Sequence, residues 1–212
     1  MKYVIPESVQ EALPILTESG GKAIVLAGGT DLVLDRHAGK KPADILVDVM
    51  RIPELSGIRI ENDEIVIGAA VTLTEIARCP LILERYPSLA KGCGTVGSLQ
   101  IRNAATLTGN VISAQPAADG AMALAPLNPT FVIEGPDGTR TQNMEEMYAG
   151  FGRSAIDPYK EMVTQIRIPC PAEHEAASFV RLELRKSLSL PMLNTAAMAR
   201  VEDGVVKMVR VT

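Results

Sequence analysis

Two stretches of this sequence carry residue types that suit the binding of a large, polar molecule with phosphate groups. The longer one, Thr95–Asp119, reads TVGSLQIRNAATLTGNVISAQPAAD and mixes glycines with hydroxyl, amide and carboxylate side chains. Glycine lets a backbone approach a ligand closely, and free backbone amides bind phosphate oxygens. Because the stretch shows no strong helical or strand period, we expect a long functional loop. The alternative is a coiled surface loop that leads into a helix near Ala117–Leu124.

The shorter stretch is Gly28-Gly29-Thr30-Asp31, which comes directly after the apolar segment Lys22–Ala27. We expect a short buried strand that ends in this turn, with Thr30 or Asp31 capping the next helix. A helix start of this kind binds anions. The stretch matches neither the GxGxxG nor the Walker pattern, so an ordinary turn that needs glycine is the alternative.

The totals exclude several other classes of function. The chain has 212 residues, and 21 basic against 25 acidic side chains give a net charge of −4, with no basic run for nucleic acid. Three cysteines without a CxxC pair and two histidines predict reduced thiols and no metal site of the chain's own. No apolar run reaches the roughly 18 residues of a membrane span, so we expect a cytoplasmic protein.

The remaining elements must position these two stretches. Hydrophobic patterns and turn residues predict an N-terminal helix capped by Ser8, and a hairpin around Asn62-Asp63. They also predict a group of helices from Thr72 to Gly94 and a second hairpin around Pro136-Asp137-Gly138. Strands then surround a boundary near Pro169–Ala177. This order predicts an α+β fold.

The last part of the chain presents a difficulty. The strand expected at Ser178–Lys186 and the hairpin around Asp203-Gly204 form a sheet with no later helix to cover it. Such a sheet exposes an apolar face and a free edge. We therefore expect either a partner or an incomplete second domain.

Three segments together resemble the FAD-binding (medium) subunit of molybdenum hydroxylases, the xanthine dehydrogenase and carbon monoxide dehydrogenase group. They are VLAGGTDLVL at Val25–Leu34, the Thr95–Asp119 stretch, and RLELRKSLSLPMLNTAA at Arg181–Ala197. The resemblance implies a FAD-binding domain over residues 1–175, with subdomains of roughly 1–55 and 56–175. Residues 176–212 would begin a C-terminal α+β domain that is short compared with the family.

The resemblance also implies the residues that bind FAD, and it implies no catalytic residue. Two loops would hold the pyrophosphate, Asp119 would hold ribityl or ribose hydroxyls, and Arg185 and Lys186 would lie near the flavin unless they are surface strand charges. The cofactor-binding residues implied in this way are Ala27, Gly28, Gly29, Thr30, Asp31, Leu32, Thr95, Gly97, Thr106, Leu107, Gly109, Asn110 and Asp119.

One departure from the family concerns Thr108. The family usually has TLGGN in the second loop, and Thr108 stands at its first glycine. A β-branched residue with a positive φ there would be strained, and its side chain would intrude on the pyrophosphate. Arg102 nearby either meets phosphate or ties the loop, and we favour the second.

The resemblance implies that the flavin receives electrons from iron–sulfur clusters on a small subunit and passes them to NAD or another acceptor. Substrate is oxidised on a large molybdopterin subunit. Two alternatives stay open: a stand-alone flavin oxidoreductase with its own substrate pocket, and a flavin-free, truncated assembly module.

Overall fold

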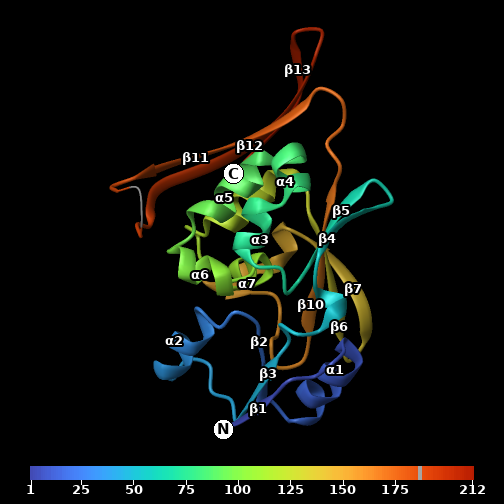
Figure 1. Ribbon diagram of the computed structural model, residues 1–212, viewed down its shortest axis with the longest axis vertical. Helices are drawn as coiled ribbons and strands as arrows, with labels where there is room; N and C mark the ends of the chain where they lie inside the picture. The colour runs from blue at the N-terminus through green and yellow to red at the C-terminus, as the bar shows by residue number, and fades with distance from the viewer. Residues whose placement is uncertain (186–187) are drawn as a thin grey trace.

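The computed structural model describes residues 1–185 and 188–212, and the three larger β-sheets follow one another along the molecule (Figure 1). A small sheet of the N-terminal segment lies at the bottom of that view, and a long three-stranded sheet lies at the top. The largest sheet lies between them, beside a group of short helices. Separate sheets with helices gathered between them confirm the expected α+β class.

The first sheet is parallel and has the strand order β1-β3-β2. Its elements are β1 Lys2–Val4, α1 Val9–Glu18, β2 Ala23–Leu26, α2 Leu32–His37 and β3 Ile45–Asp48. The apolar side of α1 packs on this sheet, with Ala12 and Leu16 fully buried. Ser8 caps α1 as expected, and the helix continues through Pro14.

The second sheet is antiparallel and has the order β4-β5-β10-β6-β7. Its strands are β4 Ile58–Glu61, β5 Glu64–Gly68, β6 Thr130–Gly135, β7 Gly138–Asn143 and β10 Met162–Pro169, and short elements η1 Pro53–Leu55, η3 Glu145–Met147, β8 Tyr148–Gly150 and β9 Arg153–Ser154 flank it. Both expected hairpins are present. Asn62 and Asp63 have the positive φ angles that a two-residue turn requires.

Short helices form one layer against this sheet. They are α3 Leu73–Arg78, α4 Pro80–Arg85, α5 Pro87–Thr95, α6 Leu99–Ala104, α7 Leu107–Ile112, α8 Asp119–Leu124 and η2 Ala125–Leu127. Their apolar sides share one core with Phe131 and Ile166 of the second sheet and with Phe179 and Met198 of the third. The helices therefore hold the second and third sheets together.

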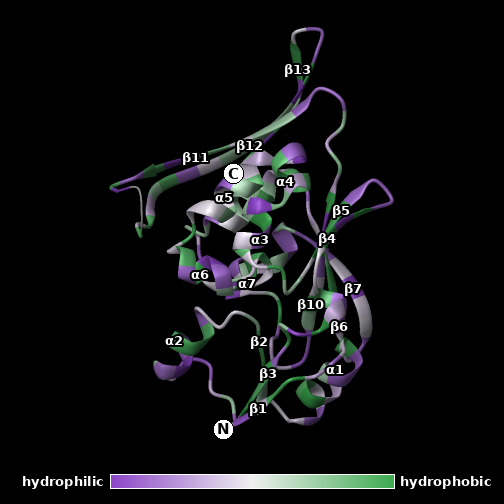
Figure 2. Ribbon diagram, viewed as in Figure 1, coloured by the Kyte–Doolittle hydropathy of each residue, from purple (hydrophilic) through white to green (hydrophobic). Residues whose placement is uncertain are grey.

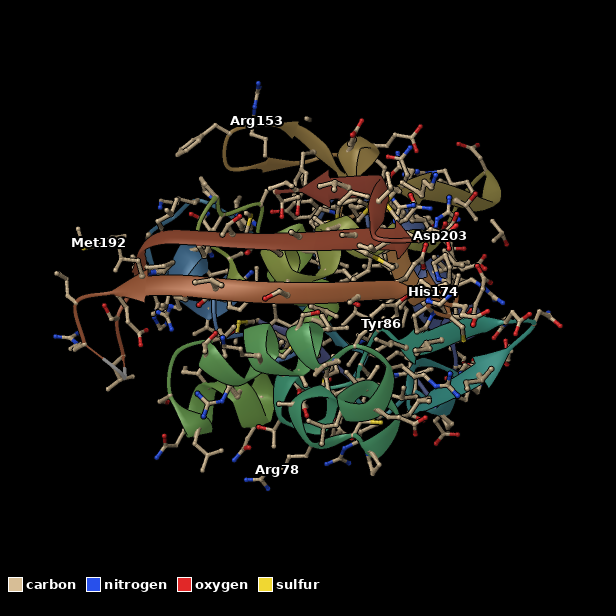
Figure 3. All side chains as sticks on the ribbon, turned by 90° about the horizontal axis from the view of Figure 1, so that it is seen from above. Arg78, Tyr86, Arg153, His174, Met192 and Asp203 are labelled. Carbon is tan, nitrogen blue, oxygen red and sulfur yellow. The ribbon has the colours of Figure 1, made fainter. Side chains whose placement is uncertain are left out.

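The third sheet has the order β11-β12-β13, with strands β11 Glu175–Glu183, β12 Pro191–Glu202 and β13 Val205–Val211. Figure 3 looks onto it, with Met192 at one end and His174 and Asp203 at the other. On the inner face of this sheet, Phe179 is buried against the helices. Val180, Leu182 and Leu193, in contrast, are more than half exposed. Green segments in Figure 2 mark the apolar residues of these strands. The expectation of an exposed apolar sheet face is confirmed.

The central stretch is not the open loop that the sequence predicts, because α6 and α7 lie within it. Each begins with a hydroxyl cap. Ser98 Oγ accepts a hydrogen bond from the Ile101 N–H at 3.3 Å. Thr106 Oγ1 accepts one from the Gly109 N–H at 2.9 Å. Such caps satisfy donors that a helix start leaves free, and they stabilise helices too short to show an apolar period.

Candidate cofactor site

The loop between β2 and α2 faces α6 and α7 (Figure 1). Residues of these elements line a cavity of about 660 Å³. Its volume is in the usual range for a site that takes a small molecule or cofactor. Further walls come from the segment before α8, from the start of β10 and from Leu188–Leu190. The site is thus assembled from all three sheet regions of the chain.

The first loop reaches the cavity by a close contact between backbones. A Cβ atom on Gly28 would lie 2.0 Å from the Ala104 carbonyl oxygen, so only glycine fits between this loop and the end of α6. Gly29 has a φ of +69°, which also favours glycine. The two glycines therefore press the first loop against the second stretch.

Asp31 occupies the N-cap position of α2, but its side chain makes no capping hydrogen bond. The expected cap is therefore absent. Desolvation raises the pKa of the Asp31 carboxyl above its ordinary value, and the Asp35 carboxylate adds to the rise.

The second stretch presents α7 to the cavity. Thr106 caps the helix, and the Asn110 side-chain oxygen accepts a hydrogen bond from the Ala121 N–H at 3.0 Å, which ties α7 to α8. Thr108 belongs to the first turn of α7, so its backbone has no positive φ and the expected strain does not arise. Its side chain is buried, and it lines the cavity.

Asp119 is held by side chains of the third sheet. Its carboxylate accepts a hydrogen bond from the Asn194 amide at 2.9 Å and lies 3.4 Å from Arg181 Nε. Arg181 in turn donates to the Thr95 carbonyl at 3.1 Å and pairs with Glu183 at 3.1 Å. Burial raises the pKa of the Asp119 carboxyl above its usual range, while Asn194 and Arg181 oppose that rise.

The structure brings most of the residues predicted for the site to this cavity. Those that line it are Ala27, Gly28, Gly29, Thr30, Asp31, Leu32, Gly97, Thr106, Gly109, Asn110 and Asp119. Thr95 and Leu107 lie outside the lining. Thr95 contributes its carbonyl to Arg181, and Leu107 is buried in the core below α7.

Sequence reasoning did not assign several other lining residues to the site. Lys41 and Glu161 contribute charge, and Ile156 and Met162 contribute apolar surface. Lys41 follows α2 and carried no pattern of its own. Glu161 directly precedes β10, and its carboxylate accepts a hydrogen bond from Arg140 at 2.9 Å.

The cationic candidates have other positions. Arg102 donates to the Val96 carbonyl at 2.9 Å and does not line the cavity, so it ties the loop through carbonyls. Arg185 donates to the Leu188 carbonyl at 2.5 Å, next to the Leu188–Leu190 wall. Lys186 lies outside the described residues.

These features fit a dinucleotide with a diphosphate. The glycine-rich first loop and the start of α7 line the same cavity, where their backbone N–H groups can bind phosphate oxygens. The buried carboxylate of Asp119 lines it too and is available for sugar hydroxyls. In the described part of the chain, the Thr108 hydroxyl is a buried side-chain group without a hydrogen-bond partner that lines this cavity. Buried polar groups are normally paired, so this oxygen suits a ligand atom.

Comparisons with known proteins agree with the geometry. A family model described as the FAD binding domain in molybdopterin dehydrogenase matches residues 1–171. The nicotinate dehydrogenase FAD-subunit of Eubacterium barkeri is 33% identical over 207 residues, which cover 96% of this chain and 70% of that protein. The carbon monoxide dehydrogenase medium chain of Hydrogenophaga pseudoflava is 30% identical over 210 residues, 99% of this chain and 72% of that one.

Solved structures share the fold over the whole chain. Carbon monoxide dehydrogenase from Hydrogenophaga pseudoflava has a TM-score of 0.92 at 29% identity, and covers 100% of this chain with 73% of its own. Quinoline 2-oxidoreductase from Pseudomonas putida 86 has a TM-score of 0.89 at 25% identity, over 100% of this chain and 72% of that one.

The chain belongs to the family of FAD-binding domains in molybdopterin dehydrogenases. It is a FAD-binding subunit of the molybdenum hydroxylase class, as its sequence resemblance implied, and FAD is its cofactor. No helix in the described residues is long and apolar enough to cross a membrane.

Proposed function

We propose that this chain is the electron-transfer subunit of a molybdenum hydroxylase. When bound, FAD would supply the redox chemistry, and electrons would pass through this chain from iron–sulfur clusters on a small partner subunit to NAD or another acceptor. A large molybdopterin subunit oxidises the substrate. The protein residues bind and orient the flavin, and none of them is required as a catalytic acid or base. We place this complex in the cytoplasm.

The observation that carries the proposal is the single cavity shared by the two loops. Backbone groups of Gly29 and of the first turn of α7 would hold the diphosphate, and Asp119 would bind sugar hydroxyls of the cofactor. Ile156 and Met162 supply apolar surface for an aromatic ring system. Among the described residues, no group of three or more His, Cys, Asp or Glu side chains could hold a metal ion.

We propose the same domain boundaries that the resemblance implies. The FAD-binding domain comprises residues 1–175, with subdomains of roughly 1–55 and 56–175, and residues 176–212 begin a C-terminal domain. The strands of the first two sheets lie within the proposed FAD-binding domain, and the third sheet is formed by the last part of the chain. The FAD-binding residues are the thirteen implied by the resemblance, of which Thr95 and Leu107 act from behind the cavity wall.

Two measurements test the proposal. The first is the visible absorption spectrum of the purified chain after incubation with FAD and desalting, where a retained flavin spectrum is expected. The second is gentle affinity purification from the source cells with iron and molybdenum analysis, where both metals are expected in the purified complex. A chain that keeps its flavin without either metal would indicate a stand-alone flavin oxidoreductase. A chain that binds no flavin but still purifies with both metals would indicate an assembly module.

A further inference from the structure

The hydroxyl of Thr108 differs from the other side-chain groups of the second loop. Thr106 uses its hydroxyl to cap α7, and Asn110 uses its side-chain oxygen to hold α8. Thr108 is 6% exposed, and its Oγ1 has no hydrogen-bond partner among the described residues. A buried hydroxyl without a partner is unfavourable, so a functional reason for it is expected.

The position of Thr108 explains why the protein itself does not satisfy this hydroxyl. Threonine inside a helix often donates to a carbonyl three or four residues earlier. Here those carbonyls belong to Ala105 and Ala104, before the helix. The Ala105 carbonyl accepts from the Leu73 N–H at 2.8 Å, and the Ala104 carbonyl packs against Gly28. The Ala105 carbonyl is therefore already used as an acceptor, and the Ala104 carbonyl faces the backbone of the first loop.

The surroundings of this hydroxyl are rich in donors. Thr108 and Leu107 are the first two residues of α7, and their N–H groups have no carbonyl partner within the helix. Gly29 and Thr30 line the same cavity from the first loop. A group placed here must accept several hydrogen bonds at once, and a phosphate oxygen does so better than a sugar hydroxyl or a ring nitrogen.

We propose that Thr108 Oγ1 donates a hydrogen bond to a phosphate oxygen of FAD. The proposal rests on the FAD site of the proposed function and does not depend on electron transfer. It reverses the expectation that this side chain obstructs the pyrophosphate.

The test compares Thr108→Val with Thr108→Ser in the apoprotein, with FAD and riboflavin as ligands. Valine keeps the branched shape and removes the hydroxyl, whereas serine keeps the hydroxyl. Because hydrogen bonds to charged acceptors are strong, the valine variant is expected to bind FAD about tenfold or more weakly. Its affinity for riboflavin, which has no phosphate, is expected to stay unchanged. The serine variant is expected to bind FAD within about threefold of the original chain.

A second readout separates binding from structure. Removal of an unpaired buried hydroxyl is expected to raise the thermal midpoint of the valine apoprotein, although FAD binds more weakly. A residue with a purely structural role would lower both quantities together. If the valine variant fails to fold, Thr108→Ala replaces it in the FAD and riboflavin comparison, with the same loss for FAD alone expected.

Two results would overturn the inference. One is a valine variant that binds FAD as tightly as the original chain, and the other is an equal loss for FAD and riboflavin. If the original chain itself binds no FAD, the proposed FAD site fails together with this inference, and that outcome is distinct from a failure at Thr108 alone.

Discussion

The two walls of the cavity are built by different means. The first wall, Ala27–Leu32, contains two adjacent glycines, and its contact with the opposite wall depends on the missing side chain of Gly28. The second wall, from α7 to Asp119, is held by side chains: a threonine cap, an asparagine link and a buried ion pair to the third sheet. The first wall includes the exposed Asp31, whereas Asp119 is 5% exposed.

This difference indicates how the site is pre-organised. Glycine-rich backbone gives close approach but little anchoring, because it has no side chains to tie it to neighbours. Side-chain anchoring needs burial and matched partners, and the third sheet supplies Arg181 and Asn194 for that purpose. We therefore expect the first wall to be sensitive to added volume and the second wall to lost partners.

The largest effect is expected for Arg181→Met, which removes the anchor of the second wall. The Arg181 side chain is 7% exposed and serves the carboxylates of Asp119 and Glu183. Loss of one partner from a buried ion pair leaves an uncompensated charge and costs about 3–5 kcal/mol. Urea unfolding measures the change in the free energy of unfolding.

Arg59→Met is the matched control, because Arg59 pairs with Glu61 at 2.6 Å while its own side chain is 40% exposed. Exposed pairs contribute about 1 kcal/mol or less. Equal losses in the two variants would show that the second wall is not anchored through Arg181.

The next effect is expected for Gly28→Ala in the first wall. Its new Cβ would lie 2.0 Å from the Ala104 carbonyl oxygen, which is backbone and cannot move aside alone. Such overpacking costs about 1–3 kcal/mol, and it should also weaken FAD binding because the two walls separate. Thermal unfolding and a FAD titration measure the two losses.

Gly109→Ala provides the comparison in the second wall. Its Cβ would meet Thr106 Oγ1 at 3.1 Å, and the residue lies inside α7, where alanine is favoured over glycine. The stability of this variant should stay close to that of the original chain. A larger loss at Gly109 than at Gly28 would reverse the assignment of volume sensitivity to the first wall.

A smaller effect compares the two helix caps. Thr106→Ala removes the hydroxyl that accepts from the Gly109 N–H and is expected to cost about 1 kcal/mol. Asp31→Ala removes no capping hydrogen bond, so its effect on the apoprotein should stay within about 0.5 kcal/mol. Parallel denaturant curves measure both. A loss at Asp31 as large as that at Thr106 would mean that the first wall also depends on its cap.

The sequence alone predicted much of this arrangement. Hairpins around Asn62-Asp63 and Pro136-Asp137-Gly138 and the strand before Gly28 were predicted correctly, because turn residues and apolar runs are local signals. The family resemblance supplied the two loops and Asp119. Eleven of the thirteen residues that it implied line the cavity, all except Thr95 and Leu107.

Other features depend on contacts that no local pattern records. The helices α6 and α7 were missed because they are six residues long, and their hydroxyl caps were counted only as possible ligand contacts. Asp119 contacts Arg181, which lies 62 positions later in the sequence, and Asn194, which lies 75 positions later. The strain expected at Thr108 did not arise, because the helix start gives that residue an ordinary backbone conformation.

The smallest predicted effect is a pH dependence in the first wall. The pKa of Asp31 is raised in the folded chain, so the folded state binds more protons than the unfolded state as pH rises through its titration. Stability contributed at this site is therefore present in acid and is lost as pH rises from the unfolded pKa through the folded one. Asp31→Asn removes the titration, so its stability relative to the original chain should increase over that window and then level off at neutral pH.

Urea midpoints measured in steps from acid to neutral pH test this sign, and Asp35→Asn provides a second variant. Without the Asp35 carboxylate, one cause of the raised pKa of Asp31 is gone. The pH range between the unfolded and folded pKa values of Asp31, over which the chain loses stability, should therefore narrow. The effect stays small because the Asp31 side chain is exposed and solvent screens its charge. If Asp31→Asn instead increases stability most in acid, the pKa of Asp31 is not raised in the folded chain.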